Sequence, residues 1–267
     1  MLSKKKINID VMGRKDFNVL NNDIDILCSA IDRNNYDIIL NCVASIGIDY
    51  CDKNRIEAFK TNTYFCKILR EIVVAEKTRI IHFSTDNVFS CETEHEPHLE
   101  NSPTCPGTWY GLTKLAGELE ICQHRNYQII RLPLLISSDP SNQRLTINNL
   151  LKKLANGEEV IAYKDVYNTP ILIDLIEPFL CINIDNRHLS SNIIHISGST
   201  NLSIYEIIYS IAKKKGMNLK KICGVMFEDS NSLVRKPRYG GLTSGYISGV
   251  PFDRSVEILL QKWKGLL

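Results

Sequence analysis

Short apolar runs alternate with segments of helical periodicity in the first half of this chain, and this alternation is the strongest constraint on its fold. Apolar runs occur at residues 36–42, 80–83 and 128–132, with amphipathic helices predicted between them at residues 56–76 and 110–122. Strands that alternate with helices pair in parallel, because each helix returns the chain to the same end of the sheet. The sequence therefore predicts an α/β protein with a Rossmann-like parallel sheet that carries helices on both faces.

The two ends of the chain extend this pattern. A short strand at residues 7–11 and a helix at residues 24–33 are predicted before the first long apolar run. After residue 136 the elements become shorter, and a smaller C-terminal part, residues 137–267, is predicted to follow a first domain of residues 1–136. The elements predicted in this smaller part are helices at residues 148–155, 203–215 and 256–264 and strands at residues 160–163 and 193–196.

The composition excludes several classes of protein. With 267 residues and 44% hydrophobic residues the chain buries a substantial core, and its net charge of only +2 does not favour nucleic acid or a membrane surface as partner. No apolar stretch approaches the roughly 18 residues needed to span a bilayer. The nine cysteines lack the short spacings of zinc or redox motifs, and His95 and His98 share a Glu-rich loop without metal-ligand spacing. We expect a cytoplasmic protein with reduced thiols and no metal.

Tyr110 and Lys114 form the first candidate site. They are four residues apart on a predicted helix and therefore share one of its faces. With the two charges about 4 Å apart at an effective dielectric constant of about 20, the Coulomb energy is roughly 4 kcal/mol. This energy would lower the pKa of a phenol from about 10 by up to about three units, so that Tyr110 exchanges protons near neutral pH. Ser84 and Thr85 end the apolar run at residues 80–83, and such sheets bind ligands at the carboxyl ends of their strands.

The same spacing recurs at Tyr209 and Lys213, where we interpret it as structural. These residues lie on the amphipathic helix at residues 203–215, and the strand before that helix is too near in sequence to supply an opposed hydroxyl. His82 lies inside the strand that precedes Ser84, and we interpret it as a core histidine.

Four motifs, two of which contain the residues of the first candidate site, occur together in a specific order. They are Asn-Cys-Val-Ala at residues 41–44, Ser-Thr-Asp-Asn-Val-Phe at 84–89, Tyr-Gly-Leu-Thr-Lys-Leu-Ala-Gly-Glu at 110–118 and Arg-Leu-Pro at 131–133. In this order they resemble the extended short-chain dehydrogenase/reductases, and among these most closely the dTDP-4-dehydrorhamnose reductase family. The resemblance extends from residue 37 to the C-terminus.

The resemblance implies a role for each matching residue. Tyr110 would donate a proton to the keto oxygen of a sugar, and Thr85 would hydrogen-bond the same oxygen. Lys114 would hold the nicotinamide ribose and lower the pKa of Tyr110. The residues that would line the site of the dinucleotide, NADPH or NADH, are Val43, Ala44, Ser84, Lys114 and Pro133.

The chain also departs from the family pattern. The family opens with a strand and a glycine-rich turn that binds the pyrophosphate, and this sequence has no Gly-x-x-Gly-x-x-Gly element. We therefore expect its sheet to lack the first strand. Arg14 and Lys15 stand where a residue that recognises the 2′-phosphate of NADP(H) is expected, and they would favour NADP(H) over NAD(H). The alternative, to which we give at least equal weight, is that they belong to an ordinary basic loop. Asn87 replaces the usual tyrosine and Leu134 replaces an aromatic residue, so the substrate side differs too.

The sequence predicts an NAD(P)H-dependent oxidoreductase that reduces a nucleotide-linked 4-keto-6-deoxy sugar, as in dTDP-rhamnose synthesis for surface polysaccharide. Residues 1–136 would bind the dinucleotide, and residues 137–267, interleaved with them, would bind the nucleotide sugar. The sequence is also compatible with a homodimer. A catalytically degenerate relative, acting as a regulatory or assembly subunit or as a sugar-nucleotide binder, is the second hypothesis, because the phosphate-binding turn is missing. A nucleotide-sugar epimerase is the third.

Overall fold

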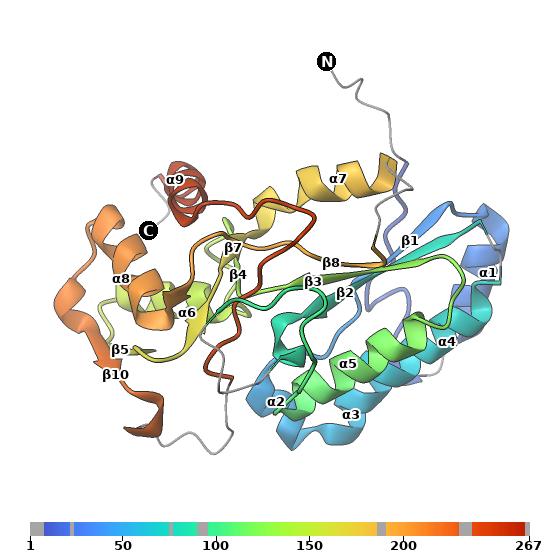
Figure 1. Cartoon of the computed structure of the whole chain (residues 1–267), viewed down its shortest axis with the longest axis horizontal. Helices are drawn as coiled ribbons and strands as arrows, with labels where there is room; N and C mark the ends of the chain where they lie inside the picture. The colour runs from blue at the N-terminus through green and yellow to red at the C-terminus, as the bar shows by residue number, and fades with distance from the viewer. Residues whose placement is uncertain are drawn as a thin grey trace.

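Four of the described strands form a parallel sheet at the centre of the larger part of the molecule. The computed structural model describes residues 8–21, 24–74, 77–89, 96–185, 191–229 and 237–264. The strands, in spatial order, are β1 (Ile38–Asn41), β2 (Arg79–Thr85), β3 (Tyr127–Leu132) and β8 (Ile193–His195), and every neighbouring pair is parallel. Figure 1 shows this sheet with helices above and below it. The prediction of a Rossmann-like α/β fold is confirmed.

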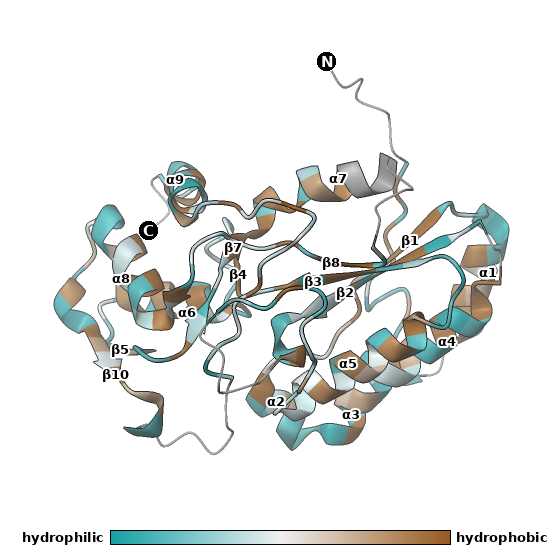
Figure 2. Ribbon diagram, viewed as in Figure 1, coloured by the Kyte–Doolittle hydropathy of each residue, from teal (hydrophilic) through white to brown (hydrophobic). Residues whose placement is uncertain are grey.

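Both faces of the sheet are covered because its strands carry apolar side chains on both sides. On one face Ile80 and Ile129 pack against α1 (Ile24–Asn34), α4 (Phe65–Ile72) and α5 (Trp109–Ile121). On the other face Ile81 and Ile130 pack against the segment that leads into α7 (Glu177–Asp185). The brown stretches in the strands of the sheet in Figure 2 mark apolar residues of this kind. Continuous apolar runs rather than alternating ones are expected of strands buried on both faces.

The helical segment predicted at residues 56–76 is divided into several pieces. Beyond β1 the chain forms α2 (Ile48–Lys53), α3 (Arg55–Phe59), a π-helical turn (Lys60–Tyr64) and then α4. The helix ends at Ile72, so its predicted extension is wrong for Val73 and Val74, and the predicted end at Glu76 lies outside the described residues. Polar residues of the π-helical turn are buried against α5, which explains why the regular helix is interrupted there.

The smaller part has its own core. The parallel strands β5 (Val160–Tyr163) and β10 (Ile222–Val225) pack with α6 (Thr146–Ala155), α8 (Ile204–Lys215) and α9 (Phe252–Lys262). Ser203 and Glu206 form a capping box at the start of α8, and Gly216 ends it with a φ of 77°. Two short strand pairs lie between this core and the central sheet: β4 (Leu135–Ile136) with β7 (Ile171–Leu172), and β6 (Tyr167–Asn168) with β9 (Leu202–Ser203).

The strand predicted at residues 7–11 is wrong for the described residues 8–11, which have no regular secondary structure. Ile7 itself lies outside the described residues. The apolar side chains that suggested a strand are exposed, Ile9 by 69% and Val11 by 82%, so burial does not favour an extended, paired conformation. Among the described strands β1 is therefore at one edge of the central sheet. None of the described helices has the length and apolar character needed to cross a membrane.

Candidate active site

The carboxyl end of β2 and the first turns of α5 meet at the site predicted from the sequence. Thr108 caps α5 by accepting a hydrogen bond from the Gly111 N–H, which fixes where the helix begins. Gly111 is required for the close approach of α5 to the end of β2, because a Cβ atom there would lie 2.0 Å from the Asn87 carbonyl oxygen. This contact places Tyr110 beside Thr85, as the sequence predicted for the ends of these two elements.

Tyr110, Thr85 and Asp86 form one hydrogen-bonded group. The Tyr110 phenol is hydrogen-bonded to the Thr85 hydroxyl. The Thr85 hydroxyl donates its only proton to Asp86 Oδ1 over 2.8 Å, and the Asn87 side-chain amide donates to the same carboxylate oxygen over 2.8 Å. The Thr85 oxygen also accepts from the Asn87 backbone N–H and from the Asn87 side-chain amide, each over 3.2 Å, and its hydrogen bond with Tyr110 acts to lower the pKa of the phenol. Burial outweighs this effect and raises the pKa of Tyr110, so the phenol carries its proton, which is the form needed in an acid.

The predicted lowering of the pKa of Tyr110 is wrong for this structure. Burial raises the pKa of Tyr110, and the nearby Asp86 carboxylate raises it further. The ammonium of Lys114 does not offset these effects, because the Lys114 side chain turns into the protein interior. Its Nζ atom lies 2.6 Å from the Phe83 carbonyl oxygen and 3.3 Å from His82 Nε2. Burial lowers the pKa of Lys114 in this position.

The residues predicted to line a dinucleotide lie at the ends of neighbouring strands. Val43 and Ala44 follow β1, Ser84 is the penultimate residue of β2, and the buried Pro133 follows β3. The Ser84 hydroxyl is buried and has no hydrogen-bond partner among the described residues. A buried hydroxyl without a partner is costly, so this atom is suited to a polar group of a bound ligand. These residues fit a dinucleotide that crosses the carboxyl ends of the strands.

Arg14 and Lys15 are exposed in a tight turn at residues 13–16, where Asp16 accepts a hydrogen bond from the Gly13 N–H. The turn lies near α2. The hydrogen bond from Tyr50 of α2 to Glu57 raises the pKa of Tyr50, and the charge of Arg14 is close enough to act in the opposite direction. None of the contacts between described residues joins Arg14 to the hydrogen-bonded group around Tyr110. The structure leaves its predicted role towards a 2′-phosphate as a prediction.

A buried ion pair anchors α5 to β3. Glu118 accepts two hydrogen bonds from Arg131, at 3.0 Å from Nε and 2.7 Å from Nη2, and both side chains are at most 3% exposed. The Arg131 guanidinium also lies over the ring of Phe89 at 5.0 Å from its centroid. Glu118 and Arg131 belong to two of the motifs in the sequence, and their pairing shows that these positions hold the helix and strand together.

Several residues of the site could not be assigned from the sequence. Asn168 Nδ2 donates to Asp86 Oδ2 over 2.6 Å, which links β6 to the end of β2. Asn62, in the π-helical turn, donates to the Thr113 hydroxyl over 3.1 Å and also pairs with the backbone of Ser45. The only signal for Asn62 in the sequence is a polar residue within the helix predicted at residues 56–76. Asn168 belongs to the Asn-Thr-Pro segment at residues 168–170, which also resembles the reductase family, but that resemblance does not give its contact with Asp86. His95 of the Glu-rich loop lies outside the described residues.

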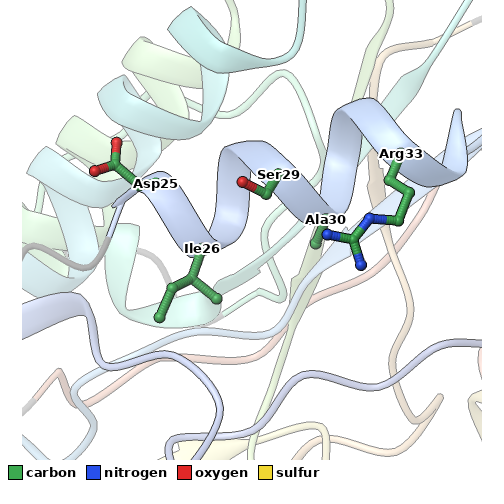
Figure 3. A pocket seen from close by; sticks show the side chains of 5 residues that line it. All are labelled: Asp25, Ile26, Ser29, Ala30 and Arg33. Atoms are coloured by element: carbon green, nitrogen blue, oxygen red, sulfur yellow. The ribbon is translucent and has the colours of Figure 1, made fainter.

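The second Tyr–Lys pair lies in the core of the smaller part. Tyr209 packs in that core and stacks on Tyr205 with ring centroids 5.7 Å apart, while Lys213 is exposed. A surface hollow elsewhere is lined by residues of a single helix, α1, and includes none of the predicted site residues (Figure 3). The lining residues are Asp25, Ile26, Ser29, Ala30 and Arg33.

A serine-threonine pair at the end of a parallel strand, opposed by a Tyr–Lys helix, places the chain among the extended short-chain dehydrogenase/reductases. More closely, it belongs to the family described as RmlD substrate binding domain, whose model matches residues 1–258.

Comparison with known proteins agrees with this assignment. A crystal structure of dTDP-4-dehydrorhamnose reductase from Bacillus anthracis in complex with NADP superposes with a TM-score of 0.85 at 18% identity, covering 94% of this chain and 89% of that one. The bifunctional dTDP-4-dehydrorhamnose 3,5-epimerase/dTDP-4-dehydrorhamnose reductase of Arabidopsis thaliana is 26% identical over 150 residues, which are 54% of this chain and 47% of the relative. The methionine adenosyltransferase 2 subunit beta of Danio rerio is 25% identical over 180 residues, 66% of this chain and 54% of the relative. The matches to these two relatives thus span only about half of their lengths.

Proposed function

We propose that the protein reduces a nucleotide-linked 4-keto-6-deoxy sugar with NADPH or NADH, as a dTDP-4-dehydrorhamnose reductase does. The observation that carries this proposal is the hydrogen bond between Tyr110 and Thr85 at the carboxyl end of β2. A protonated phenol and a hydroxyl at this edge of the sheet are suited to receive a keto oxygen and to protonate it. Family membership supports the same reaction.

The dinucleotide would be held by Val43, Ala44, Ser84 and Pro133, with Lys114 turned towards its ribose and Arg14 near the adenosine end. When bound, the nicotinamide supplies the hydride. Ser84 offers its unpartnered hydroxyl to the ligand. Tyr110 then gives its proton to the sugar oxygen, while Asp86 keeps the Thr85 hydroxyl in place through a bond of 2.8 Å.

The direct test is oxidation of NADPH or NADH by the purified protein, followed by absorbance, with and without a dTDP-linked 4-keto-6-deoxy sugar. We expect oxidation only when the sugar nucleotide is present, and product analysis should show a hydroxyl at the fourth carbon. Cofactor oxidation that does not depend on the sugar, or none with either cofactor, would contradict the proposal.

A second candidate function is that of a catalytically inactive subunit that regulates or assembles with another enzyme, or that only binds a sugar nucleotide. It is supported by the likeness to a relative whose name describes a beta subunit. Titration calorimetry with NADPH separates the two candidates. A dissociation constant for NADPH in the micromolar range or below supports the reductase. The absence of binding at a millimolar concentration of NADPH supports the inactive subunit.

A homodimer is part of the proposal. Four large apolar side chains are exposed on the neighbouring helices α3 and α5, by 75% for Ile56, 46% for Phe59, 45% for Leu112 and 61% for Leu119. An exposed apolar surface of this kind is typical of an association site. Light scattering should give the mass of a dimer for the native protein and of a monomer for Leu119→Lys.

The assignment of the two ligands to different parts of the chain and the cellular location of the protein are also proposals. We assign the dinucleotide to residues 1–136 and the nucleotide sugar to residues 137–267, although β8 of the second part lies in the central sheet. We place the protein in the cytoplasm, which agrees with the eight described cysteines, all of which are free thiols. Cys91 lies outside the described residues.

A further inference from the structure

A continuous chain of polar groups runs through the interior from the backbone of Val43 to the side chain of Lys114. The Val43 N–H donates to Asn41 Oδ1 over 3.1 Å, and Asn41 Nδ2 lies 3.0 Å from His82 Nδ1. On the other side of the imidazole, His82 Nε2 lies 3.3 Å from Lys114 Nζ, which donates to the Phe83 carbonyl oxygen over 2.6 Å. Asn41, His82 and Lys114 are all at most 3% exposed, so these contacts are shielded from water.

The Val43 N–H is the first group in this series of contacts, and it determines the direction of the hydrogen bonds that follow. A backbone N–H can only donate, so the side-chain oxygen of Asn41 must face Val43. The side-chain NH₂ of Asn41 therefore faces His82 Nδ1, and it can only donate as well. His82 Nδ1 must accept this bond and carries no proton. A neutral His82 consequently carries its proton on Nε2, and burial lowers the pKa of His82 well below its ordinary value, which keeps it neutral.

The Nε2–H of His82 then points towards Lys114 Nζ. An ammonium group has three N–H donors and no acceptor, so it would oppose this proton, whereas a neutral amine has a lone pair that accepts it. A neutral Lys114 can accept from His82 and still donate to the Phe83 carbonyl oxygen. Burial and the absence of a directly paired carboxylate among the described contacts favour the neutral form, although Cys66, Glu118 and Cys42 lie close enough to oppose the lowering of its pKa.

We propose that His82, with its tautomer set by Asn41, is a positioning residue that holds Lys114 as a neutral amine in the ligand-free protein. The proposal deepens the proposed function in one respect. The role of Lys114 towards a nicotinamide ribose requires Nζ to leave His82 and the Phe83 carbonyl, and an amine released from this environment takes up a proton from solvent. Cofactor binding would then be coupled to uptake of a proton by Lys114.

The tautomer of His82 can be measured without cofactor or substrate. Long-range proton–nitrogen correlation spectra of the ¹⁵N-labelled protein distinguish an Nε2–H from an Nδ1–H imidazole, and His82→Gln identifies the signal. We expect the Nε2–H tautomer. In Asn41→Asp the second carboxylate oxygen replaces the NH₂ group, so that His82 should switch to the Nδ1–H tautomer. An Nδ1–H tautomer or a charged imidazole in the native protein at neutral pH would overturn the proposal.

Cys66→Ala is the matched control for the tautomer. Cys66 Sγ lies 3.9 Å from His82 Nδ1 and is its other polar neighbour among the described contacts. The thiol donates to the Asn62 carbonyl oxygen over 3.3 Å, so we expect its removal to leave the Nε2–H tautomer unchanged. A switch of tautomer in Cys66→Ala would assign the control of His82 to the thiol instead of Asn41 and would contradict the proposal.

The charge of Lys114 is the second measurement. The proton–carbon signal of the Lys114 ε-methylene, identified by its loss in Lys114→Met, should titrate at a lower pH than the exposed lysines. His82→Phe removes the N–H donor, and Asn41→Asp makes Nε2 an acceptor for the ammonium, so both should move the titration to higher pH. In His82→Gln the amide N–H can take the position of the His82 Nε2–H, so Lys114 should still titrate at low pH. An ordinary lysine titration in the native protein would overturn the proposal.

Calorimetry of NADPH binding in buffers with different ionisation enthalpies tests the coupling. Above the titration midpoint of Lys114 we expect net proton uptake in the native protein and in His82→Gln, and its loss in Asn41→Asp. Cofactor binding without proton uptake contradicts the coupling. Failure to bind the cofactor counts against the proposed function, while the histidine and lysine spectra still decide the proposal for His82.

Discussion

Asp86 and Asn168 are separated by 82 positions in the sequence, yet Asn168 Nδ2 donates to Asp86 Oδ2 over 2.6 Å in the protein interior. This bond joins the loop after β2 to β6 in the smaller part, and Asn168 Oδ1 accepts from the Leu134 N–H over 2.8 Å at the same time. Asp86 in turn orients the Thr85 hydroxyl. The geometry of the proposed active site thus depends on a side chain from the other half of the molecule.

Asn168→Ala should lower both stability and turnover. It leaves a buried carboxylate oxygen and a partly buried N–H without their partner, and a buried group without a partner costs about 1–3 kcal/mol. Urea unfolding measures the loss of free energy, and a coupled cofactor-oxidation assay measures turnover. Asn34→Ala on the exposed surface of α1, which removes hydrogen bonds to Ala30 and Tyr36, is the control and should change stability much less. Equal stability of the two variants would contradict the importance of the Asp86–Asn168 bond.

Tyr110→Phe should abolish reduction without unfolding the protein. General acid catalysis contributes roughly 10² to 10⁴-fold to a rate, and the variant loses only the phenolic oxygen. Steady-state kinetics should show a fall in kcat of that order, with a melting temperature close to that of the native protein. Tyr209→Phe, at the second Tyr–Lys pair, is the matched control and should retain full activity. A Tyr110→Phe protein that keeps native kcat would rule out the proposed proton donor.

Gly111→Ala should displace α5 from the end of β2. A Cβ atom at this position would lie 2.0 Å from the Asn87 carbonyl oxygen, so helix and loop must separate. Overpacking of this kind typically costs about 1–3 kcal/mol, and we expect a larger loss of kcat than of stability because Tyr110 moves away from Thr85. Gly13→Ala is the control, since its nearest contact, Asp16 Oδ2 at 3.8 Å, is an ordinary one. A fully active Gly111→Ala would show that α5 does not need this close approach.

Glu118→Gln should destabilise the protein strongly, because it leaves the buried Arg131 guanidinium without its counter-charge. Removal of one partner of a buried ion pair costs about 3–5 kcal/mol. Chemical denaturation provides the measurement. In the exposed pair Arg254–Glu257, whose side chains are 61% and 59% exposed, Glu257→Gln should cost no more than about 1 kcal/mol. If the two substitutions cost the same, the Glu118–Arg131 pair is not an anchor of α5.

His195 should make the protein sensitive to mild acid. Burial lowers the pKa of His195 from 6.5 to about 4, so the folded state resists its protonation. The unfolded state binds the proton below pH 6.5, and stability is therefore full above pH 6.5 and is lost as the pH falls towards 4. The loss from this residue approaches about 3 kcal/mol.

The contribution of His195 is measured by unfolding at a series of pH values between 7 and 4. His195→Asn keeps a donor near the Thr243 carbonyl oxygen, which His195 Nδ1 contacts at 2.8 Å, but cannot titrate in this range. Its stability should therefore fall less steeply with acid than that of the native protein. Because burial also lowers the pKa of His82, part of the acid sensitivity should remain. Identical pH profiles for the native protein and His195→Asn would contradict the assignment.

Much of the fold was predictable from the sequence, because it depends on patterns that are local. The apolar runs at β2 and β3 and the periodicity of α5 mark elements whose side chains are buried on known faces, and the structure places these elements as predicted. The strand predicted at residues 7–11 failed for the complementary reason: local β propensity does not produce a strand where the side chains stay exposed. The π-helical turn was also missed, because it depends on bonds from Asn62 and Thr63 to α5.

The sequence by itself determined the parallel α/β fold, the family, and the presence of Tyr110, Thr85 and Lys114 at one edge of the sheet. The tertiary structure decided how these groups are charged and oriented. Tyr110 is half-buried, and this burial together with the nearby Asp86 carboxylate raises its pKa, while Lys114 turns towards His82 and does not lower the pKa of Tyr110. Spacing along a helix determines which side chains share a face, but burial, hydrogen-bond partners and distant residues such as Asn168 determine their protonation, and these depend on three-dimensional packing.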